Sequence, residues 1–289
     1  MHNVIQELRG NIRVYVRVRP FLSSDKGVDL EGKLDPCVKV KQDGVGCEIN
    51  RVEDGVVQES HKWEFDKSFP CPTTQDDIFL EVKEFVQSAL DGYNVCLFSY
   101  GQTGSGKTHT MQGYGKGEQR GIIPRSIEKI GQYREQMKEK GWEYSMAVTF
   151  IEVYNEQTFD LLRPEGSEKR DLPIKQDAKG KTFVQDVSKL VTDPTDLKAI
   201  DDLMDTAALH RATASTDMNA VSSRSHSIFS LYVTGQNEEL GATVNGTLHL
   251  CDLAGSFQSL TVPITSREPL LSRCASTEAI TRRCRKRNQ

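Results

Sequence analysis

One short string combines glycines, a lysine and a hydroxyl at the spacing of a phosphate-binding loop. Residues 101–108 read GQTGSGKT and fit G-x-x-x-x-G-K-[ST]. Glycines let the backbone wrap around a phosphate with its N–H groups, Lys107 brings a positive charge to the β- and γ-phosphates, and the Thr108 hydroxyl can ligate Mg²⁺. A flexible glycine loop is the alternative interpretation. The pattern assigns a nucleotide contact to Gly101, Gln102, Thr103, Gly104, Ser105, Gly106, Lys107 and Thr108.

Two later segments could sense the terminal phosphate. Asp252 and Gly255 follow an apolar run, where an aspartate can hold the magnesium shell and a glycine N–H can bond the γ-phosphate. The string NAVSSRSH at 219–226 packs three hydroxyls and a cation together, although a hydroxyl-rich helix cap is an alternative. No N-K-x-D string is present in the sequence, which disfavours a guanine-specific site without proving ATP.

The elements that must position these residues follow from periodicity. A short apolar run over 95–100 leads directly into the loop, as expected of a buried parallel strand. A helix is expected from about Lys107, with its positive end at the phosphates. Alternating or helical spacing predicts further strands over 12–18, 145–154, 228–234 and 247–253, and helices over 78–89, 124–138 and 195–211. Strands that alternate with helices predict an α/β fold with a mixed or parallel sheet.

Composition excludes several classes of protein. The 289 residues hold 37 basic and 41 acidic side chains, so the net charge of −4 makes a nucleic-acid partner unlikely from bulk charge. No apolar run approaches the roughly 18 residues that span a bilayer, and the N-terminus lacks a secretory apolar region, so no membrane association is expected. Seven scattered cysteines without a C-x-x-C pair suit a reducing compartment.

The two ends of the chain differ from the middle. Met1, Val4, Ile5 and Leu8 share one helical face, which predicts either a frayed capping helix or the end of a longer coiled coil. Residues 267–289 hold seven basic and two acidic side chains, a net charge of +5, so residues 1–266 carry a net charge of −9. Periodicity disappears after Ser256, and we expect the tail to be largely disordered.

Six strings in order resemble the kinesin motor domain: GNIRVYVRVRP (10–20), YGQTGSGKTHTM (100–111), GIIPR (121–125), FIEVYNE (150–156), NAVSSRSH (219–226) and LCDLAGS (250–256). IQELRGNIRV resembles the neck of the C-terminal-motor, minus-end-directed kinesins, in which a dimerising coiled-coil stalk precedes the motor. The resemblance implies a P-loop NTPase of kinesin type with a central mixed, mostly parallel sheet flanked by helices and truncated at its C-terminal end. The implied parts are the end of a neck helix at 1–9, an incomplete motor domain at 10–256 and a non-homologous basic tail at 257–289.

The resemblance also assigns roles by position. It implies ATP and Mg²⁺ as ligands, the microtubule as partner, and a place in the cytoplasm on the cytoskeleton. Arg17, Arg19 and Pro20 match the adenine-pocket motif and His109 matches a residue that flanks the base, although the residues alone suggest a solvated strand face and an ordinary surface histidine. Ser222 and Ser223 match switch I, and Asp252 and Gly255 match switch II. The metal is implied at Thr108, Ser223 and Asp252, and catalysis at Lys107, Ser223, Arg224, Asp252 and Gly255.

The resemblance breaks after Ser256. Kinesins continue the switch II string with a glutamate that pairs with the switch I arginine, Arg224 here, and helps to order the attacking water, whereas this chain has Phe257. The family's switch II helix, later helices and last strand are not recognisable in 257–289. We therefore expect impaired hydrolysis, and marginal stability because one face of the sheet would lack its covering helices. Of the expected tubulin-facing residues, only Lys169, Arg170, Lys175, Lys179 and Lys181 remain, and a solvated face explains them equally well.

Two alternatives stay open at this point. One is a non-catalytic pseudo-motor whose basic tail contacts an acidic surface such as tubulin, or a nucleic acid. The other is a truncated gene product, because the composition changes abruptly after an intact motif.

Overall fold

A mixed sheet with helices on one of its faces forms the centre of the protein. The computed structural model describes residues 2–20, 22, 38–53, 56–178, 180–212, 224–256 and 277–285. The nine-stranded sheet has the order β11-β7-β12-β13-β6-β14-β1-β5, with β8 paired to β7. Its strands are β1 (Ile12–Val18), β5 (Lys67–Phe69), β6 (Asn94–Tyr100), β7 (Glu143–Tyr154), β8 (Gln157–Asp160), β11 (Leu190–Val191), β12 (His226–Asn237), β13 (Ala242–Asp252) and β14 (Thr277–Arg285).

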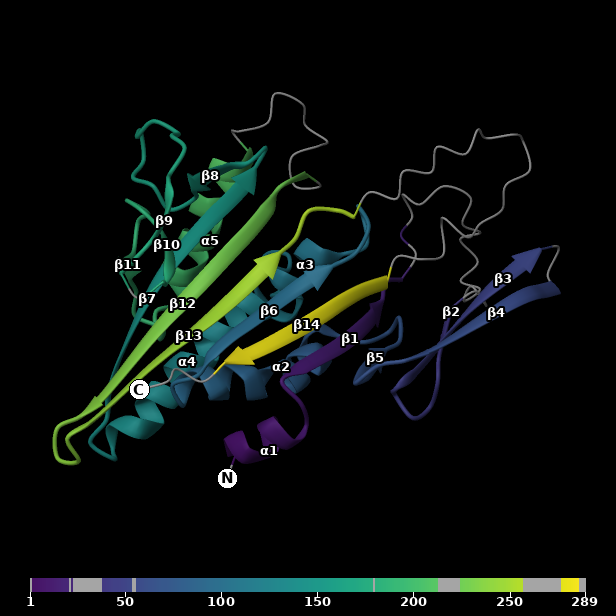
Figure 1. Ribbon diagram of the computed structural model, residues 1–289, viewed down its shortest axis with the longest axis horizontal. Coiled ribbons are helices and arrows are strands. Elements are labelled where there is room, and N and C mark those ends of the chain that lie inside the picture. The colour runs from purple at the N-terminus through teal and green to yellow at the C-terminus, as the bar shows by residue number, and fades with distance from the viewer. Residues whose placement is uncertain are drawn as a thin grey trace.

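The helices match the predicted ones closely. They are α1 (His2–Leu8), α2 (Gln75–Leu90), α3 (Lys107–Met111), α4 (Ile122–Lys138) and α5 (Leu197–Ala212), with a short 3₁₀ turn η1 (Gly117–Gln119). Figure 1 shows α2, α3, α4 and α5 gathered behind the sheet. The predicted strands and helices are therefore confirmed in kind, with ends shifted by a few residues. In the described part of the chain, no helix is both long and apolar enough to cross a membrane.

The expectation of a mostly parallel sheet is wrong. Among the strands of this sheet that the structure describes, only β6 with β13 and β1 with β5 pair in parallel. The pairs of β7 with β8, β11 and β12, of β12 with β13, and of β14 with both its neighbours are antiparallel. The reason is local connection: β12 and β13 are joined by residues 238–241, and β7 and β8 by Asn155 and Glu156 at positive φ. Such short turns can only join antiparallel strands.

The expectation of a disordered tail is wrong for residues 277–285, which form β14. This strand lies between β1 and β6, with Ile280 opposite both Tyr15 and Ser99. The physical reason is that β1 and β6 would otherwise each present a row of unpaired backbone groups, and a strand between them satisfies both rows. Residues 257–276 and 286–289 of the tail lie outside the described part. The tail strand β14 therefore lies in the sheet between β1, which leads to the adenine motif, and β6, which leads to the phosphate loop (Figure 1).

Burial alternates along the central strands because only one face of the sheet is covered. Val95, Leu97 and Ser99 of β6 are fully buried on the helix side, whereas Cys96 and Phe98 on the other side are only half-buried. The nearly continuous apolar run of β6 predicts a strand buried on both faces. The structure covers only one face, and the apolar Cys96 and Phe98 on the other face hide this alternation in the sequence. Figure 1 shows no described helix in front of that second face. The marginal stability expected from an uncovered face stays a prediction.

Helix α2 carries most of the contact between the covered face and the helical layer. Thr74 and Asp77 form a capping box at its start, with Thr74 Oγ1 accepting from Asp77 N and Asp77 accepting from Thr74 N. Phe85 of α2 is fully buried and stacks on Tyr15 of β1 with ring centroids 5.9 Å apart. Because α2 begins at Gln75, the same contacts that bury the helix also place its first turn beside the loop region described below.

Two small sheets and the first helix lie at the periphery. β2 (Val38–Val40), β3 (Gly46–Glu53) and β4 (Val56–Glu64) form a three-stranded sheet, and β9 (Ile174–Gln176) pairs with β10 (Thr182–Val184). The three-stranded sheet projects from one side of the molecule (Figure 1). The predicted N-terminal helix is present, and its Val4, Ile5 and Leu8 are exposed. Asn3 ties it to α2 by donating to Asp91 at 2.7 Å.

Candidate phosphate and nucleotide site

The predicted loop lies where the sequence places it, between β6 and α3. Gly104 and Gly106 have φ of 81° and 102°, a left-handed backbone that glycine adopts without strain. Lys107 is 7% exposed, and its Nζ donates to the carbonyl oxygens of Gly101 and Gln102 at 3.0 Å each. The Ser105 hydroxyl is buried and has no hydrogen-bond partner among the described residues. The loop therefore holds a buried cation and an unsatisfied donor around its backbone.

The two predicted metal ligands that the structure describes are in direct contact. Thr108 Oγ1 donates to Asp252 Oδ2 at 2.6 Å, and Ser99 Oγ donates to Asp252 Oδ1 at 3.4 Å. Parallel pairing of β6 and β13 brings them together, because Asp252 lies opposite Ser99 at the carboxyl ends of both strands. A hydroxyl and one carboxylate are hard oxygen donors that fit Mg²⁺, which takes few protein ligands and completes its shell with phosphates and water. The described residues hold no group of three or more His, Cys, Asp or Glu side chains that would favour another metal site.

The segment after Asp252 folds back onto the loop. Ser256 N donates to the carbonyl oxygen of Gly101 at 3.0 Å, so Gly255 lies beside the start of the phosphate loop. Ala254 N donates to His226 Nδ1 at 3.1 Å, which joins the switch II string to the last residue of the switch I string. The structure therefore brings Gly255 into the predicted site.

Of the switch I string at 219–226, the structure describes residues 224–226. Ser222, Ser223 and Phe257 lie outside the described residues, so the roles assigned to the two serines and the loss of the glutamate stay predictions. Arg224 is exposed, and its neighbour Ser225 is buried. The Ser225 hydroxyl accepts from Arg211 Nη2 at 3.2 Å, which anchors the end of the segment.

A buried charge cluster behind Asp252 was not predicted from the sequence. Arg211 Nη1 lies 3.5 Å from Asp252 Oδ2, and its Nε lies 3.5 Å from Glu152 Oε1. Lys169 Nζ lies 3.4 Å from the other oxygen of Glu152, whose side chain is fully buried. The available signal was Glu152 itself, a carboxylate within an otherwise apolar strand pattern. Arg211 and Thr108 thus both contact the Oδ2 oxygen of Asp252.

The cluster changes the interpretation of the cations assigned to a tubulin surface. Lys169 is not simply solvated, because its ammonium also lies 3.9 Å from the centroid of the Phe159 ring. Arg170 is exposed and lies 3.7 Å from Asp186. Lys175 and Lys181 are exposed, and Lys179 lies outside the described residues. Lys169 thus belongs to the buried charge cluster. The exposed Arg170, Lys175 and Lys181 fit both a tubulin-binding surface and a solvated face.

The residues of the predicted adenine pocket converge at the edge of the loop. Arg17 Nη1 donates to Gln75 Oε1 at 2.9 Å and to Thr110 Oγ1 at 2.7 Å, so Arg17 does not lie on a solvated strand face. The Arg19 side chain packs over the loop, with its Cδ 3.7 Å from where a Cβ on Gly106 would lie. Pro20 follows on the surface.

His109 belongs to the same region and is held between two glutamines. Burial lowers the pKa of His109, and the nearby Arg17 guanidinium lowers it further, while a hydrogen bond with Gln119 acts in the opposite direction. The imidazole is therefore neutral at pH 7 and presents an uncharged ring beside the arginines. Gln75, which contacts both Arg17 and His109, was not singled out by the sequence.

The chain matches known proteins over most of its length. The family model of the kinesin motor domain matches residues 17–265. The Kinesin-like protein KIN-14D of Arabidopsis thaliana is 41% identical over 269 residues, which cover 89% of this chain and 33% of that protein. The Kinesin-like protein KAR3 of Saccharomyces cerevisiae is 41% identical over 264 residues, 89% of this chain and 35% of the relative. The chain thus spans about a third of the length of these curated relatives.

Solved structures agree with this assignment. The C-terminal motor and motor homology domain of Kar3Vik1, fused to a synthetic heterodimeric coiled coil, superposes with a TM-score of 0.73 at 40% identity, covering 89% of this chain and 64% of that one. The motor domain of KAR3 from Saccharomyces cerevisiae gives a TM-score of 0.68 at 38% identity, with 85% and 72% covered. The phosphate loop, the Thr108–Asp252 contact and these matches together place the chain in the kinesin motor-domain family, with C-terminal-motor kinesins among its relatives.

Proposed function

We propose that this chain binds Mg·ATP at residues 101–108 as the nucleotide-binding core of a microtubule-based motor. Kinesin motor domains bind nucleotide and act as ATP-driven motors on microtubules. The observation that carries the proposal is the 2.6 Å contact of Thr108 Oγ1 with Asp252 Oδ2 at the end of a glycine-rich loop. P-loop NTPases hold their magnesium with these two groups. The neck at 1–9 and the motor at 10–256 are the corresponding proposed parts.

Each residue has a distinct task in this proposal. Lys107 neutralises the β- and γ-phosphates, and the Gly255 N–H bonds the γ-phosphate. Thr108, Ser223 and Asp252 hold Mg²⁺, which when bound offsets the negative charge that develops on the phosphates. Water then attacks the γ-phosphorus in line and the bond to the β–γ bridging oxygen breaks. The products are ADP and inorganic phosphate, and the proton lost by the attacking water is released to solvent or taken up by the phosphate. The base binds among Arg17, Arg19, Pro20 and His109.

Hydrolysis by this chain is proposed to be slow. The resemblance of the switch II string to that of kinesins implies a glutamate at the position of Phe257, and an aromatic ring cannot accept the Arg224 guanidinium that would close the site. Without that pair the attacking water is poorly oriented, and orientation supplies much of the catalysis of phosphoryl transfer. The same residue favours the second candidate, a pseudo-motor that binds nucleotide without turning it over.

The partner and location follow from the family. Microtubule binding is proposed to be weak, because among the described residues of the expected surface only Arg170, Lys175 and Lys181 are exposed cations not tied to a buried acid. The exposed apolar side chains of α1 support dimerisation through a preceding coiled coil. Action on the cytoplasmic cytoskeleton is part of the proposal.

Lys107→Ala is expected to weaken binding of a fluorescent ATP analogue by about 10- to 150-fold, since hydrogen bonds to charged groups contribute about 1.5–3 kcal/mol. Lys116→Ala is the matched control, because Lys116 is exposed and lies 3.6 Å from Asp201, away from the loop. Fluorescence titration with Mg²⁺ present gives the dissociation constants. Equal affinity of the Lys107 variant and the unaltered chain would overturn the proposed site.

Phe257→Glu is expected to raise microtubule-stimulated phosphate release by about 10–100-fold, because it restores a partner for Arg224 and so the orientation of the attacking water. Phe257→Gln is the control, since it adds a polar group without the charge. Stimulated turnover by the unaltered chain at the rate of the glutamate variant would contradict the proposed impairment. No turnover by any of the three chains would support the pseudo-motor instead.

A further inference from the structure

A single buried glutamine connects four segments at the base end of the loop region. Gln75 is the first residue of α2 and is 4% exposed. Its Oε1 accepts from Arg17 Nη1 at 2.9 Å, and its Nε2 donates to the His109 carbonyl at 2.7 Å. The same Nε2 lies 3.5 Å from the carbonyl oxygen of Gln119. One amide therefore holds β1, α3 and the α3–α4 loop against the start of α2.

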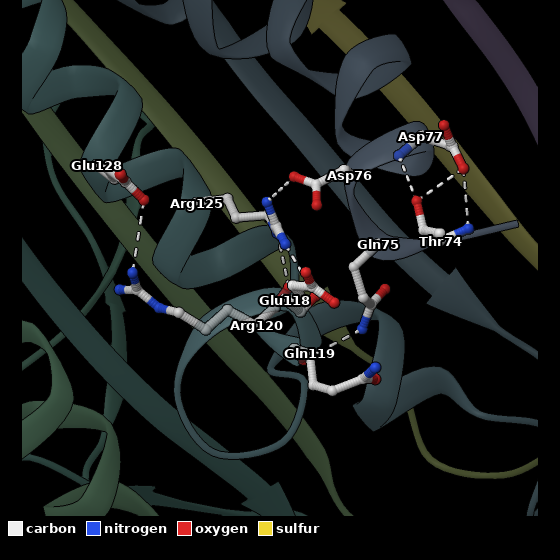
Figure 2. Close-up of polar contacts among 9 residues, drawn as sticks. All are labelled: Thr74, Gln75, Asp76, Asp77, Glu118, Gln119, Arg120, Arg125 and Glu128. Atoms are coloured by element: carbon white, nitrogen blue, oxygen red, sulfur yellow. Dashed lines mark hydrogen bonds and ion pairs between the residues drawn. The ribbon is translucent and has the colours of Figure 1, made fainter.

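Asp76, the next residue of α2, holds the same loop indirectly through Arg125. Arg125 pairs with Asp76 and donates through Nη2 to the Glu118 carbonyl at 2.9 Å. Figure 2 shows Gln75 directed toward Gln119 and Asp76 directed toward Arg125, whose guanidinium lies next to Glu118. The loop also returns to α3, because Gln119 Oε1 lies 3.2 Å from His109 Nε2. The position of His109 is thus determined through both glutamines.

The chemistry at this position requires an amide. The guanidinium of Arg17 needs an acceptor, whereas the two carbonyl oxygens need a donor, and a glutamine side chain offers one of each in a fixed plane. A carboxylate of the same length would keep the contact with Arg17 but would direct a negative charge at the His109 and Gln119 carbonyls. Alanine would leave Arg17 with one acceptor fewer in a buried site.

The contacts of Gln75 are separate from those of the phosphate-loop residues Lys107 and Thr108. Lys107 and Thr108 are hydrogen-bonded to the loop and to Asp252, and none of these contacts involves Gln75. Since Gln75 is almost fully buried, it acts through Arg17 and His109 rather than by touching a ligand. A change at Gln75 should therefore alter the base end of the site and leave the phosphate end as it is.

We propose that Gln75 is a positioning residue that holds Arg17 and His109 for recognition of the purine base of a nucleoside triphosphate. The inference rests on the proposed nucleotide function and deepens it. It divides the binding of ATP into a base-dependent part, which needs the Gln75 amide, and a phosphate-dependent part, which does not.

Competition between a fluorescent ATP analogue and two unlabelled ligands, ATP and inorganic tripolyphosphate, tests this division in the full chain with Mg²⁺. Gln75→Ala and Gln75→Glu are each expected to raise the dissociation constant of ATP about tenfold or more. Alanine removes the hydrogen bond to the charged Arg17, whereas glutamate keeps that bond but directs a negative charge at the His109 and Gln119 carbonyls. The constant for tripolyphosphate should stay within about twofold, because no phosphate contact is lost. Gln87→Ala is the matched control, since Gln87 lies on the same helix and bonds only locally to Asp91.

The outcomes are distinct. Equal weakening of ATP and tripolyphosphate in both Gln75 variants, or no weakening of ATP, would overturn the positioning role. If the alanine variant does not fold, as judged by thermal unfolding, the nearly isosteric glutamate variant decides. Failure of the unaltered chain to bind either ligand would instead contradict the proposed nucleotide site.

Discussion

Gly246→Ala is expected to lower the free energy of unfolding by about 3 kcal/mol or more, because it forces two backbones apart. Gly246 lies in β13, where a Cβ would overlap the carbonyl oxygen of Ala89 and lie 2.8 Å from its carbonyl carbon. Ala89 is in the last turn of α2, and a backbone carbonyl cannot rotate away as a side chain could. Relief therefore requires a shift of α2, whose Phe85 and Val86 are fully buried against the sheet. Urea unfolding followed by circular dichroism measures the loss.

Thr247→Ala is the control in the same strand. Thr247 is half-buried and points to the opposite face of the sheet, so its truncation is expected to cost less than about 1 kcal/mol. A Gly246 variant within the same range would show that α2 can move without cost and would contradict the close approach. Because α2 also begins with Gln75, a shift of this helix should weaken ATP binding as well.

Glu152→Ala is the second substitution with a large expected effect, a loss of about 3–5 kcal/mol in the free energy of unfolding. The Glu152 carboxylate is fully buried and lies between the cations of Arg211 and Lys169. Its removal leaves the Arg211 guanidinium, itself only 10% exposed, with less compensating charge. An uncompensated buried charge is more costly than the original pair is stabilising, because both ions have already lost their hydration.

Glu143→Ala, at the exposed start of the same strand, is the matched control and should stay within about 0.5 kcal/mol of the unaltered chain. Chemical denaturation at pH 7 compares the variants. Since Arg211 also contacts Asp252, the Glu152 variant should weaken Mg²⁺-dependent nucleotide binding in addition. A Glu152 variant as stable as the Glu143 variant would mean that the cluster is hydrated and contributes little.

Local elements were predictable because they depend on local chemistry. β1, α2 and β12 follow from periods of two and of about 3.6 residues, which depend only on which face of an element is buried. The loop at 101–108 was predictable for a similar reason, since its glycines, lysine and hydroxyl carry their function within eight consecutive residues. The family resemblance added Asp252 and Gly255, and the structure brings both beside that loop.

Contacts between distant segments were not predictable from these patterns. A period of two residues indicates a strand but not the direction of its neighbour. That most strand pairs are antiparallel is seen only in the structure, where short turns join β7 to β8 and β12 to β13. The absence of helical or strand periodicity after Ser256 predicts a disordered tail, whereas β14 is held by backbone pairing on both sides, which side-chain patterns do not report.

Local sequence patterns were enough to predict the phosphate loop and the helices and strands around it, and six strings in order indicated the family that the comparisons then showed. The tertiary structure decided which charges and amides meet: Glu152 with Arg211 and Asp252, and Gln75 with Arg17 and His109. These partners are separated by dozens of residues along the chain, and the sequence patterns that single out Arg17, His109 and Asp252 do not include Gln75 or Arg211. Their roles arise from burial and distance, which exist only once the sheet has aligned its strands and the helices have packed against one face.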